Sequence, residues 1–350
     1  MTVVVSPGLQ LFVPGRLCLF GEHSDWAGAL RERDGTIVPG ACLVVGTQQG
    51  IRASVETAEG FSISSPSAGG PQHWPMDGTA LRGAAAAGGF FSYAAGVAAE
   101  VWERYRVPGL RVAVQASDLP IRRGLSSSAA ICVLVARGFN RAYELRLSVR
   151  DEMELAYKGE LRTGSQCGRM DQVCAYGACP TLLSFDGTSM TVEPLRPRRA
   201  LHLLVVDLCA GKDTRRILAT LHAAFLGSDG AGRRALRDAL GARNRALVAA
   251  ARCAVEDGDA AQLGALMTEA QAVFDQAVAP ACPEELTAPR LHGVLGHPAA
   301  RACAWGGKGV GSQGDGAAQF VCRGVEARDK LARRLTADCA VQCLPLTIRG

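Results

Sequence analysis

Short apolar runs separated by glycine and proline fill the first 45 residues, and this pattern predicts strands joined by turns. Later segments have either the periodicity of helices or the composition of short strands. The predicted helices cover residues 92–105, about 129–143 and about 150–160, and the predicted strands cover residues 10–20, 36–45, 110–114, 181–185 and 201–206. This mixture of elements predicts an α+β fold.

The C-terminal part of the chain has a different texture. Residues 235–256 and 260–278 are long stretches rich in alanine and leucine with helical periodicity. The change falls between residues 195 and 210, and 350 residues exceed what one typical hydrophobic core organises. We therefore expect an N-terminal lobe of residues 1–200 and a C-terminal lobe of residues 201–350.

The longest uncharged segment, residues 83–99, is about as long as a membrane span but is interrupted by Gly88, Gly89 and Gly96. We interpret it as a buried helix. The N-terminus lacks the basic start and the cleavage site of a signal peptide. The thirteen cysteines are odd in number and include no CxxC pair. These features predict a cytoplasmic protein with reduced thiols and no membrane partner.

The formal net charge of +5 does not indicate a nucleic-acid partner. Only four of the 38 basic residues are lysine, and the arginines are scattered in pairs among acidic residues. Aromatic residues make up 5% of the chain, so little surface can stack on bases. We expect small-molecule partners and no nucleic acid.

A glycine followed by small hydroxyl residues precedes the helix predicted at about residue 129. Such a segment lets the backbone approach a ligand, and the N–H groups of the helix N-terminus point at the same place. It can therefore cradle the phosphates of a nucleotide, although a helix capped by Ser126 explains the same residues. The residues of this serine loop are Gly124, Leu125, Ser126, Ser127, Ser128 and Ala129.

Four segments resemble, in order, the motifs of the GHMP superfamily of small-molecule kinases in their galactokinase-like form. Residues 120–129 match P-x-x-x-G-L-S/G-S-S-A, the ATP loop of the family, and residues 14–25 are similar to P-G-R-x-N-L-I-G-E-H-T-D. Residues 164–172 are similar to G-x-x-C-G-x-M-D-Q, and residues 305–316 take the place of the glycine-rich C-terminal motif. The resemblance implies a two-lobed GHMP kinase fold with the active site in the cleft between the lobes.

The chain departs from the galactokinase pattern at a few positions. Cys18 stands where galactokinases have Asn, and Trp26 and Ala27 stand where they have Tyr and Asn. The C-terminal motif is less rich in glycine, because Gln313 and Asp315 interrupt it. These departures put the identity of the sugar in question more than the chemistry.

The resemblance implies that the serine loop binds ATP and that Ser128, or its neighbour Ser127, holds Mg²⁺ together with Glu160. Oxygen ligands of this kind suit Mg²⁺, which the protein shares with the phosphates. Asp171 would hold the acceptor hydroxyl as a base or a charge partner, and Arg16 would neutralise charge on the transferred group. The structural alternatives are a solvated helix end for Glu160 and an ion pair joining two loops for Arg16 and Asp171.

Glu22, His23 and Asp25 lie close together after an apolar strand. Two carboxylates and an imidazole can bond several hydroxyls at once, as a polyol substrate requires. We assign these residues to substrate binding, with a packed structural histidine as the alternative for His23. Trp26 can stack on a sugar face or simply pack.

Together these features predict an ATP-dependent, galactokinase-like sugar kinase that phosphorylates the anomeric C1 hydroxyl. The alternatives are an anomeric kinase of a heptose or octose phosphate, a mevalonate-type kinase, and a non-catalytic sugar sensor on the same fold. The sugar-phosphate alternative uses the arginines of residues 31–34 and 122–123 as an anion site. In the plainer interpretation, the arginines at 31 and 33 pair with the acids beside them on a solvated turn. The oligomeric state is left open.

Overall fold

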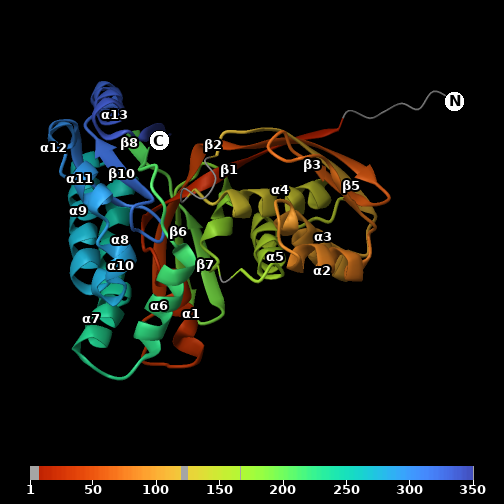
Figure 1. Ribbon diagram of the computed structural model, residues 1–350, viewed down its shortest axis with the longest axis horizontal. Coiled ribbons are helices and arrows are strands. Elements are labelled where there is room, and N and C mark those ends of the chain that lie inside the picture. The colour runs from red at the N-terminus through yellow and green to blue at the C-terminus, as the bar shows by residue number, and fades with distance from the viewer. Residues whose placement is uncertain (1–7, 120–124, 166, 350) are drawn as a thin grey trace. The chain divides into compact units, whose positions relative to one another are not determined.

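The computed structural model describes residues 8–119, 125–165 and 167–349 (Figure 1). Contacts divide the chain into two compact units, unit 1 with residues 1–16 and 46–177, and unit 2 with residues 17–45 and 178–350. This division groups residues 17–45 with the C-terminal half of the chain. The lobe boundary expected near residue 200 stays a prediction.

Unit 1 contains strands that pair around β2 (Gly40–Ala58). β2 runs antiparallel to β5 (Gly109–Ser117), with Val55 opposite Val112, and it also pairs with β1 (Leu9–Phe20). The order continues from β5 to β3 (Phe61–Ser64) and β4 (Gln72–Trp74). The strands predicted at 10–20 and 110–114 are confirmed, whereas the one predicted at 36–45 begins only at Gly40 and continues to Ala58.

Helices lie on one face of these strands in unit 1 (Figure 1). They are α2 (Gly78–Ala86), α3 (Ser92–Tyr105), α4 (Ser127–Ala142) and α5 (Val149–Leu161), followed by the 3-10 segment η2 (Asp171–Tyr176). The helices predicted at 92–105, 129–143 and 150–160 are confirmed. The single buried helix predicted at 83–99 is wrong, because the chain leaves α2 after Ala86 and turns at Gly88 and Gly89 with φ of 74° and 102°. Glycine adopts such angles without strain.

α3 and α5 approach each other closely at two glycines. A Cβ on Gly159 would lie 2.6 Å from Cα of Val97, and a Cβ on Gly96 would lie 2.2 Å from the carbonyl oxygen of Gly159. Any larger side chain at either position would force the helices apart. The close contact fixes the C-terminal end of α5, where Glu160 lies.

Unit 2 contains the first residues of β2, which pair with β6 (Thr181–Asp186), and β6 pairs with β7 (Ser189–Pro194). A separate four-stranded sheet has the order β11 (Gln342–Ile348), β8 (Leu201–Asp207), β10 (Ala317–Cys322) and β9 (Ala304–Gly309). The strands predicted at 181–185 and 201–206 are confirmed.

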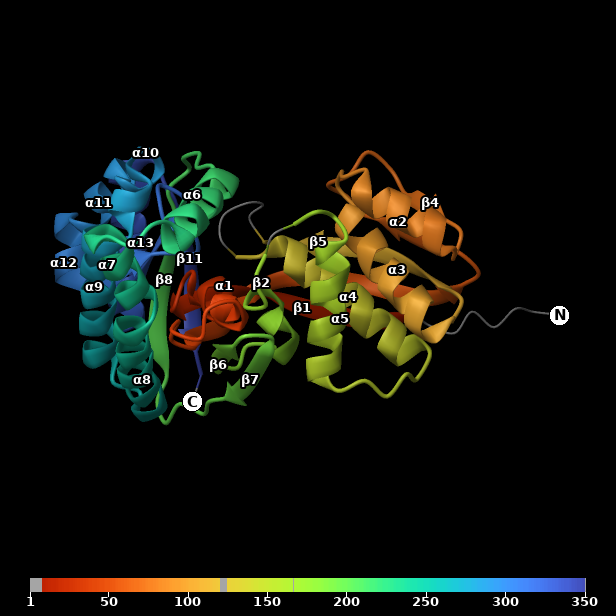
Figure 2. The same cartoon turned by 90° about the horizontal axis from the view of Figure 1, so that it is seen from below.

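Alternate residues of β8 and β10, including Leu204, Val206 and Phe320, form a core with α11 (Pro289–Leu295), α12 (Pro298–Cys303) and α13 (Val325–Cys339). α9 (Ala260–Ala277) contacts β9 and β10 and packs beside α8 (Ala242–Asp257) and α7 (Ala231–Leu240), as Figure 2 shows. The single helical stretch predicted at 235–256 is wrong, because Gly241 separates α7 from α8. The remaining elements are α1 (Ser24–Ala29), η1 (Leu30–Glu32), α6 (Thr214–Leu226), η3 (Ala279–Ala281) and α10 (Pro283–Leu286).

The cysteines are all free thiols, and most of them are buried or half-buried. Within residues 8–119, 125–165 and 167–349, no helix is long and apolar enough to cross a membrane. The uncharged segment at 83–99 is divided between two helices that belong to unit 1.

Candidate active site

The predicted site residues fall into two groups, one in each unit, and each group is described by itself. The serine loop, Arg16, Glu160 and Asp171 belong to unit 1, and Glu22, His23 and Asp25 belong to unit 2. Gly124 lies outside the described residues, as does the rest of the 120–124 segment. The described part of the serine loop is therefore residues 125–129.

The serine loop leads directly into α4, as predicted. Ser126 is the residue before the first helical turn and has a left-handed backbone with φ of 53°, and its carbonyl oxygen accepts the N–H of Ala130 at 3.0 Å. Its side chain makes no capping hydrogen bond, so the prediction of a serine side-chain cap is wrong. Ser127 and Ser128 occupy the first turn, whose N–H groups have no partner within the helix.

Glu160 is brought to the serine loop by α5. Its carboxylate is 2% exposed and accepts hydrogen bonds from the Ser128 hydroxyl and, at 2.7 Å, from Nε2 of Gln172. Burial raises the pKa of Glu160 to about 7, and the nearby Asp171 carboxylate acts in the same direction. Glu160 is thus a buried acid beside a hydroxyl, and the alternative of a solvated helix end is wrong.

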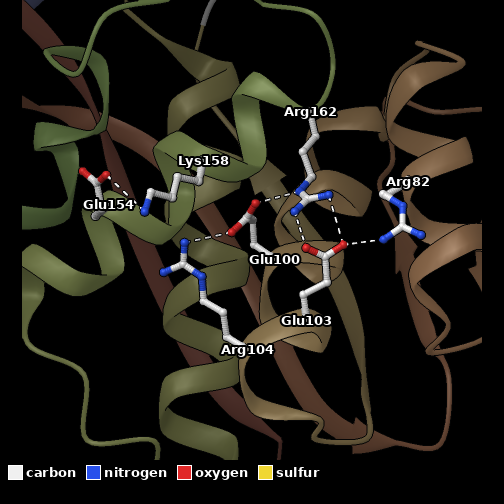
Figure 3. Close-up of polar contacts among 7 residues, drawn as sticks. All are labelled: Arg82, Glu100, Glu103, Arg104, Glu154, Lys158 and Arg162. Carbon is white, nitrogen blue, oxygen red and sulfur yellow. Dashed lines mark hydrogen bonds and ion pairs between the residues drawn. The ribbon is translucent and has the colours of Figure 1, made fainter. Parts of the chain in front are cut away.

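An ion-pair network holds the C-terminal end of α5 against α3 and α2 (Figure 3). Arg162 bonds Glu100 at 2.7 Å and Glu103 at 2.5 Å, and Glu103 also bonds Arg82 of α2 at 2.5 Å. Arg104 completes the network through Glu100 at 3.0 Å. Because Arg162 follows Glu160 by two residues, this network and the Gly96–Gly159 contact together set the position of the Glu160 carboxylate.

Arg16 and Asp171 form an ion pair, as predicted. Nε and Nη2 of Arg16 donate to Oδ1 of Asp171 at 3.0 and 2.5 Å. Arg16 lies on β1, which passes close to the serine loop at Gly15. A Cβ on Gly15 would lie 2.8 Å from the carbonyl oxygen of Leu125, so this close approach requires glycine. That carbonyl accepts the N–H of Arg16 at 3.1 Å, which joins the strand to the serine loop.

In unit 2, Glu22 is buried against a residue that the sequence analysis did not assign. Nζ of Lys308, in β9, donates to Oε1 of Glu22 and, at 2.9 Å, to the carbonyl oxygen of Gly309. The side chains of Glu22 and Lys308 are 5% and 2% exposed. The first carboxylate of the predicted substrate group is therefore already paired with a cation.

His23 is packed among aromatic rings of unit 2. Nε1–H of Trp26 donates to Nδ1 of His23 at 3.1 Å, and the His23 ring stacks on Phe274. Burial lowers the pKa of His23 to about 3, and the positive charges of Lys212 and Lys308 add to this effect. His23 is consequently a neutral imidazole in unit 2, with Trp26 bonded to one of its nitrogens.

The segment that carries Glu22 and Asp25 is held by buried polar side chains from distant parts of unit 2. Nε2 of Gln319 donates to the carbonyl oxygen of Cys18 at 2.7 Å, and Nδ2 of Asn244 donates to Oγ of Ser24 at 3.0 Å. Asp25 itself is buried in the first turn of α1. These bonds explain why residues 17–45 group with the C-terminal half of the chain.

Arg31 and Asp34 of the turn at residues 31–34 pair with residues outside that turn, and the anion site stays a prediction. Arg31 bonds Asp186 at 2.5 Å and the carbonyl oxygen of Ile37 at 2.6 Å, and Asp34 bonds Arg237 at 2.9 Å. Arg31 and Asp34 therefore fasten the turn to other parts of unit 2, and Arg31 pairs with the distant Asp186 and not with an acid beside it in sequence. The pair at 122–123 lies outside the described residues.

Sequence reasoning missed three residues of the two groups. Gln172 is the last residue of the motif at residues 164–172, and its position next to Asp171 could have indicated that it belongs to the site. Lys308 is one of only four lysines in the chain and lies in the glycine-rich C-terminal motif. Nothing in the sequence around Asn244 points to the segment that it bonds.

Comparisons with known proteins give sequence relatives for a large part of the chain. The family model of the GHMP kinases N-terminal domain matches residues 92–178. The galactokinase of Actinobacillus succinogenes is 28% identical over 256 residues, which cover 67% of this chain and 59% of that protein. A galactokinase of Haemophilus influenzae is 27% identical over 253 residues, which cover 66% of this chain and 59% of that protein. The chain thus spans about three fifths of the length of these curated relatives.

Solved structures share the fold over almost the whole chain. Methanococcus jannaschii mevalonate kinase superposes with a TM-score of 0.75 at 14% identity, covering 99% of each chain. Lactococcus lactis galactokinase, solved with galactose, superposes with a TM-score of 0.75 at 16% identity, covering 97% of this chain and 92% of that one. These similarities confirm the predicted two-lobed α+β fold. Residues 92–178 thus belong to the GHMP kinases N-terminal domain family, and the chain as a whole is similar in sequence to galactokinases and in fold to GHMP kinases.

Proposed function

We propose that this protein is an ATP-dependent sugar kinase that transfers the γ-phosphoryl group of ATP to a sugar hydroxyl, the anomeric C1 hydroxyl. The observation that carries the proposal is the convergence in unit 1 of the Ser128–Glu160 pair with the Arg16–Asp171 ion pair. The galactokinase homologues support the sugar as the class of acceptor.

The residues around Glu160 fit Mg²⁺ by the chemistry of their donors. A serine hydroxyl and a carboxylate are oxygen ligands, and Mg²⁺ bound with a nucleotide needs few protein ligands because phosphates and water supply the others. Burial and the nearby Asp171 raise the pKa of Glu160 to about 7, so a cation at this position would stabilise its charged form. When bound, Mg²⁺ neutralises charge on the β- and γ-phosphates of ATP.

Asp171 is the proposed partner of the acceptor hydroxyl. Nε and Nη2 of Arg16 both donate to Oδ1 of Asp171, and Oδ2 is the oxygen that would accept the proton of the sugar hydroxyl. Phosphoryl transfer passes through a loose transition state and depends mainly on alignment and charge neutralisation. Arg16 would hold Asp171 in position and offset charge on the transferred group.

Glu22, His23 and Asp25 are the proposed sugar-binding residues. The low pKa of His23 makes it a neutral hydrogen-bonding group, which suits a hydroxyl better than an anion. Two acidic side chains in the same segment also favour a polyol over the carboxylate of mevalonate. The cleft between the lobes as the place of the reaction and the cytoplasm as its location stay predictions.

The proposal is tested by measuring ADP release with Mg²⁺–ATP and a panel of free sugars, heptose and octose phosphates, and mevalonate. We expect turnover with a free sugar and a product phosphorylated at C1, which ³¹P NMR identifies. Turnover only with a sugar phosphate or only with mevalonate would replace the proposed substrate by that alternative. Sugar binding without ADP release from any compound would indicate a sensor.

A further inference from the structure

Lys308 and Glu22 form an ion pair inside unit 2 that joins β9 to the segment after β1. Nζ of Lys308 donates to Oε1 of Glu22 and to its own neighbour, the carbonyl oxygen of Gly309. The two side chains are 2% and 5% exposed, and the residues are 286 positions apart in the sequence. The pair therefore fixes one carboxylate oxygen of Glu22 at a point set by the four-stranded sheet.

A buried ion pair of this kind is poorly explained by stability alone. Removing two charges from water costs about as much as their attraction returns, and apolar replacements of similar volume are often neutral or stabilising. A pair retained in the interior therefore needs another reason, and the best-supported one is the selection of a single geometry.

The identity of the cation is also informative. Only four of the 38 basic residues in this chain are lysine, yet lysine stands at this fully buried position. The surroundings are crowded, because a Cβ on the adjacent Gly309 would lie 1.9 Å from Oε1 of Gln313. A compact ammonium fits such a place and can donate to two oxygens at once, whereas the broad planar guanidinium of arginine cannot replace it there.

Glu22 and Lys308 are not wholly enclosed by packed atoms. Together with Phe274 and Gln313 they line a cavity of about 40 Å³ within unit 2, which has room for a hydroxyl group. Gln313 is buried, and its Oε1 has no hydrogen-bond partner in the described part of the chain. The cavity is lined mainly by apolar residues, and its polar lining residues are Glu22, Asn244, Lys308 and Gln313.

We propose that Lys308 is a positioning residue that determines sugar affinity: it holds Oε1 of Glu22 and supplies its counter-charge, so that Oε2 of Glu22 accepts a hydrogen bond from a substrate hydroxyl. This inference rests on the proposed sugar kinase function. It assigns Lys308 to recognition of the polyol and gives it no part in phosphoryl transfer, which uses residues of unit 1.

The experiment uses the full-length protein and the sugar with the highest kcat/KM in the substrate panel. The variants are Lys308→Met, Glu22→Gln, the double variant and Leu335→Ala, which damages the core of unit 2 away from this pair. For each variant, kcat, KM for sugar, KM for ATP and Tm are measured. We expect Lys308→Met to raise the sugar KM about tenfold or more, with kcat and the ATP KM within about threefold.

The double variant shows whether Lys308 affects the sugar KM through Glu22. If Lys308 acts through Glu22, the double variant has the same sugar KM as Glu22→Gln alone. The double variant leaves no unpaired buried charge, so it remains informative if Lys308→Met fails to fold. Leu335→Ala should lower Tm and leave the sugar KM unchanged, and Lys308→Arg should not restore the wild-type sugar KM.

An unchanged sugar KM in Lys308→Met, or effects of the two substitutions that simply add, would overturn the inference while leaving the sugar kinase intact. A sugar KM that rises equally in Leu335→Ala would also overturn it, because the change would then report damage to unit 2 in general. A wild-type enzyme without sugar-dependent ADP release refutes the proposed function itself and the inference with it.

Discussion

The hydroxyl of Ser128 donates a hydrogen bond to the buried carboxylate of Glu160, although the two residues lie on different helices of unit 1. Nε2 of Gln172 also donates to this carboxylate, at 2.7 Å. The proposed phosphate-binding turn and the proposed metal ligand are therefore joined by a direct hydrogen bond. The first predictions concern this coupling.

Glu160→Gln should raise the Mg²⁺ concentration needed for half-maximal activity by about tenfold or more at fixed ATP, because an amide is a weaker Mg²⁺ ligand than a carboxylate. The measurement is a Mg²⁺ titration of the initial rate at saturating ATP and sugar. Glu154→Gln on the same helix, whose side chain is partly exposed and pairs with Lys158 and Arg169, is the matched control. Superimposable titrations for Glu160→Gln and wild type would remove Glu160 from the metal site.

Asp171→Asn should lower kcat by about a thousandfold or more with the ATP KM little changed, because the lost charge acts mainly on the acceptor and the transferred group. Single-turnover rates and ATP binding by calorimetry separate these two quantities. A variant that keeps more than about a tenth of wild-type turnover would contradict the assignment.

Gly159→Ala should both destabilise unit 1 and raise the Mg²⁺ concentration needed for half-maximal activity. A Cβ at this position would meet Val97 atoms at 2.5–2.7 Å, so α5 must move away from α3, at a cost of roughly 1–3 kcal/mol. Gly83→Ala in α2 is the control, because a Cβ there meets nothing within 4 Å and alanine favours the helix by about 0.5–1 kcal/mol. Urea unfolding and the Mg²⁺ titration provide the readouts, and equal behaviour of the two variants would contradict the close-contact explanation.

The contribution of His23 to the stability of the protein should fall as the pH drops below about 6.5. The pKa of His23 is lowered from 6.5 to about 3 by burial, so between these values the unfolded chain binds a proton that the folded chain does not. This contribution is complete above about pH 6.5 and decreases as the pH falls towards 3, by on the order of 1–2 kcal/mol at pH 5.

Urea unfolding of wild type and His23→Gln at pH 7 and pH 5 tests this, because glutamine does not titrate. Burial also lowers the pKa of His222, which stacks on Trp26, but that residue is common to both proteins and its effect cancels in the comparison. Glu160, whose raised pKa acts in the opposite direction, is also common to both proteins. Between pH 7 and pH 5, the free energy of unfolding of the variant should therefore fall less, or rise more, than that of wild type. Equal slopes for the two proteins would mean that His23 is protonated as easily in the folded state as in the unfolded chain.

Local pattern was sufficient for many of the elements and for the family. The helix at 92–105 and the strands at 181–185 and 201–206 could be read from periodicity, because periodicity records which residues face a core. The order of four motifs indicated the resemblance to GHMP kinases and predicted Arg16, Glu160 and Asp171 as site residues. Periodicity did not show the breaks after Ala86 and at Gly241, because a single glycine within an apolar run is compatible with a continuous helix.

Only the tertiary structure decided which side chains meet. Lys308 reaches Glu22 across 286 positions and Asn244 reaches Ser24 across 220, and no local signal in the sequence records such pairs. The same holds for the grouping of residues 17–45 with the C-terminal half of the chain. Sequence pattern reports the environment of a residue along its own element, whereas buried polar partners are fixed by how distant elements pack. The sequence therefore determined which residues are candidates for the site, and the fold determined which side chains they contact.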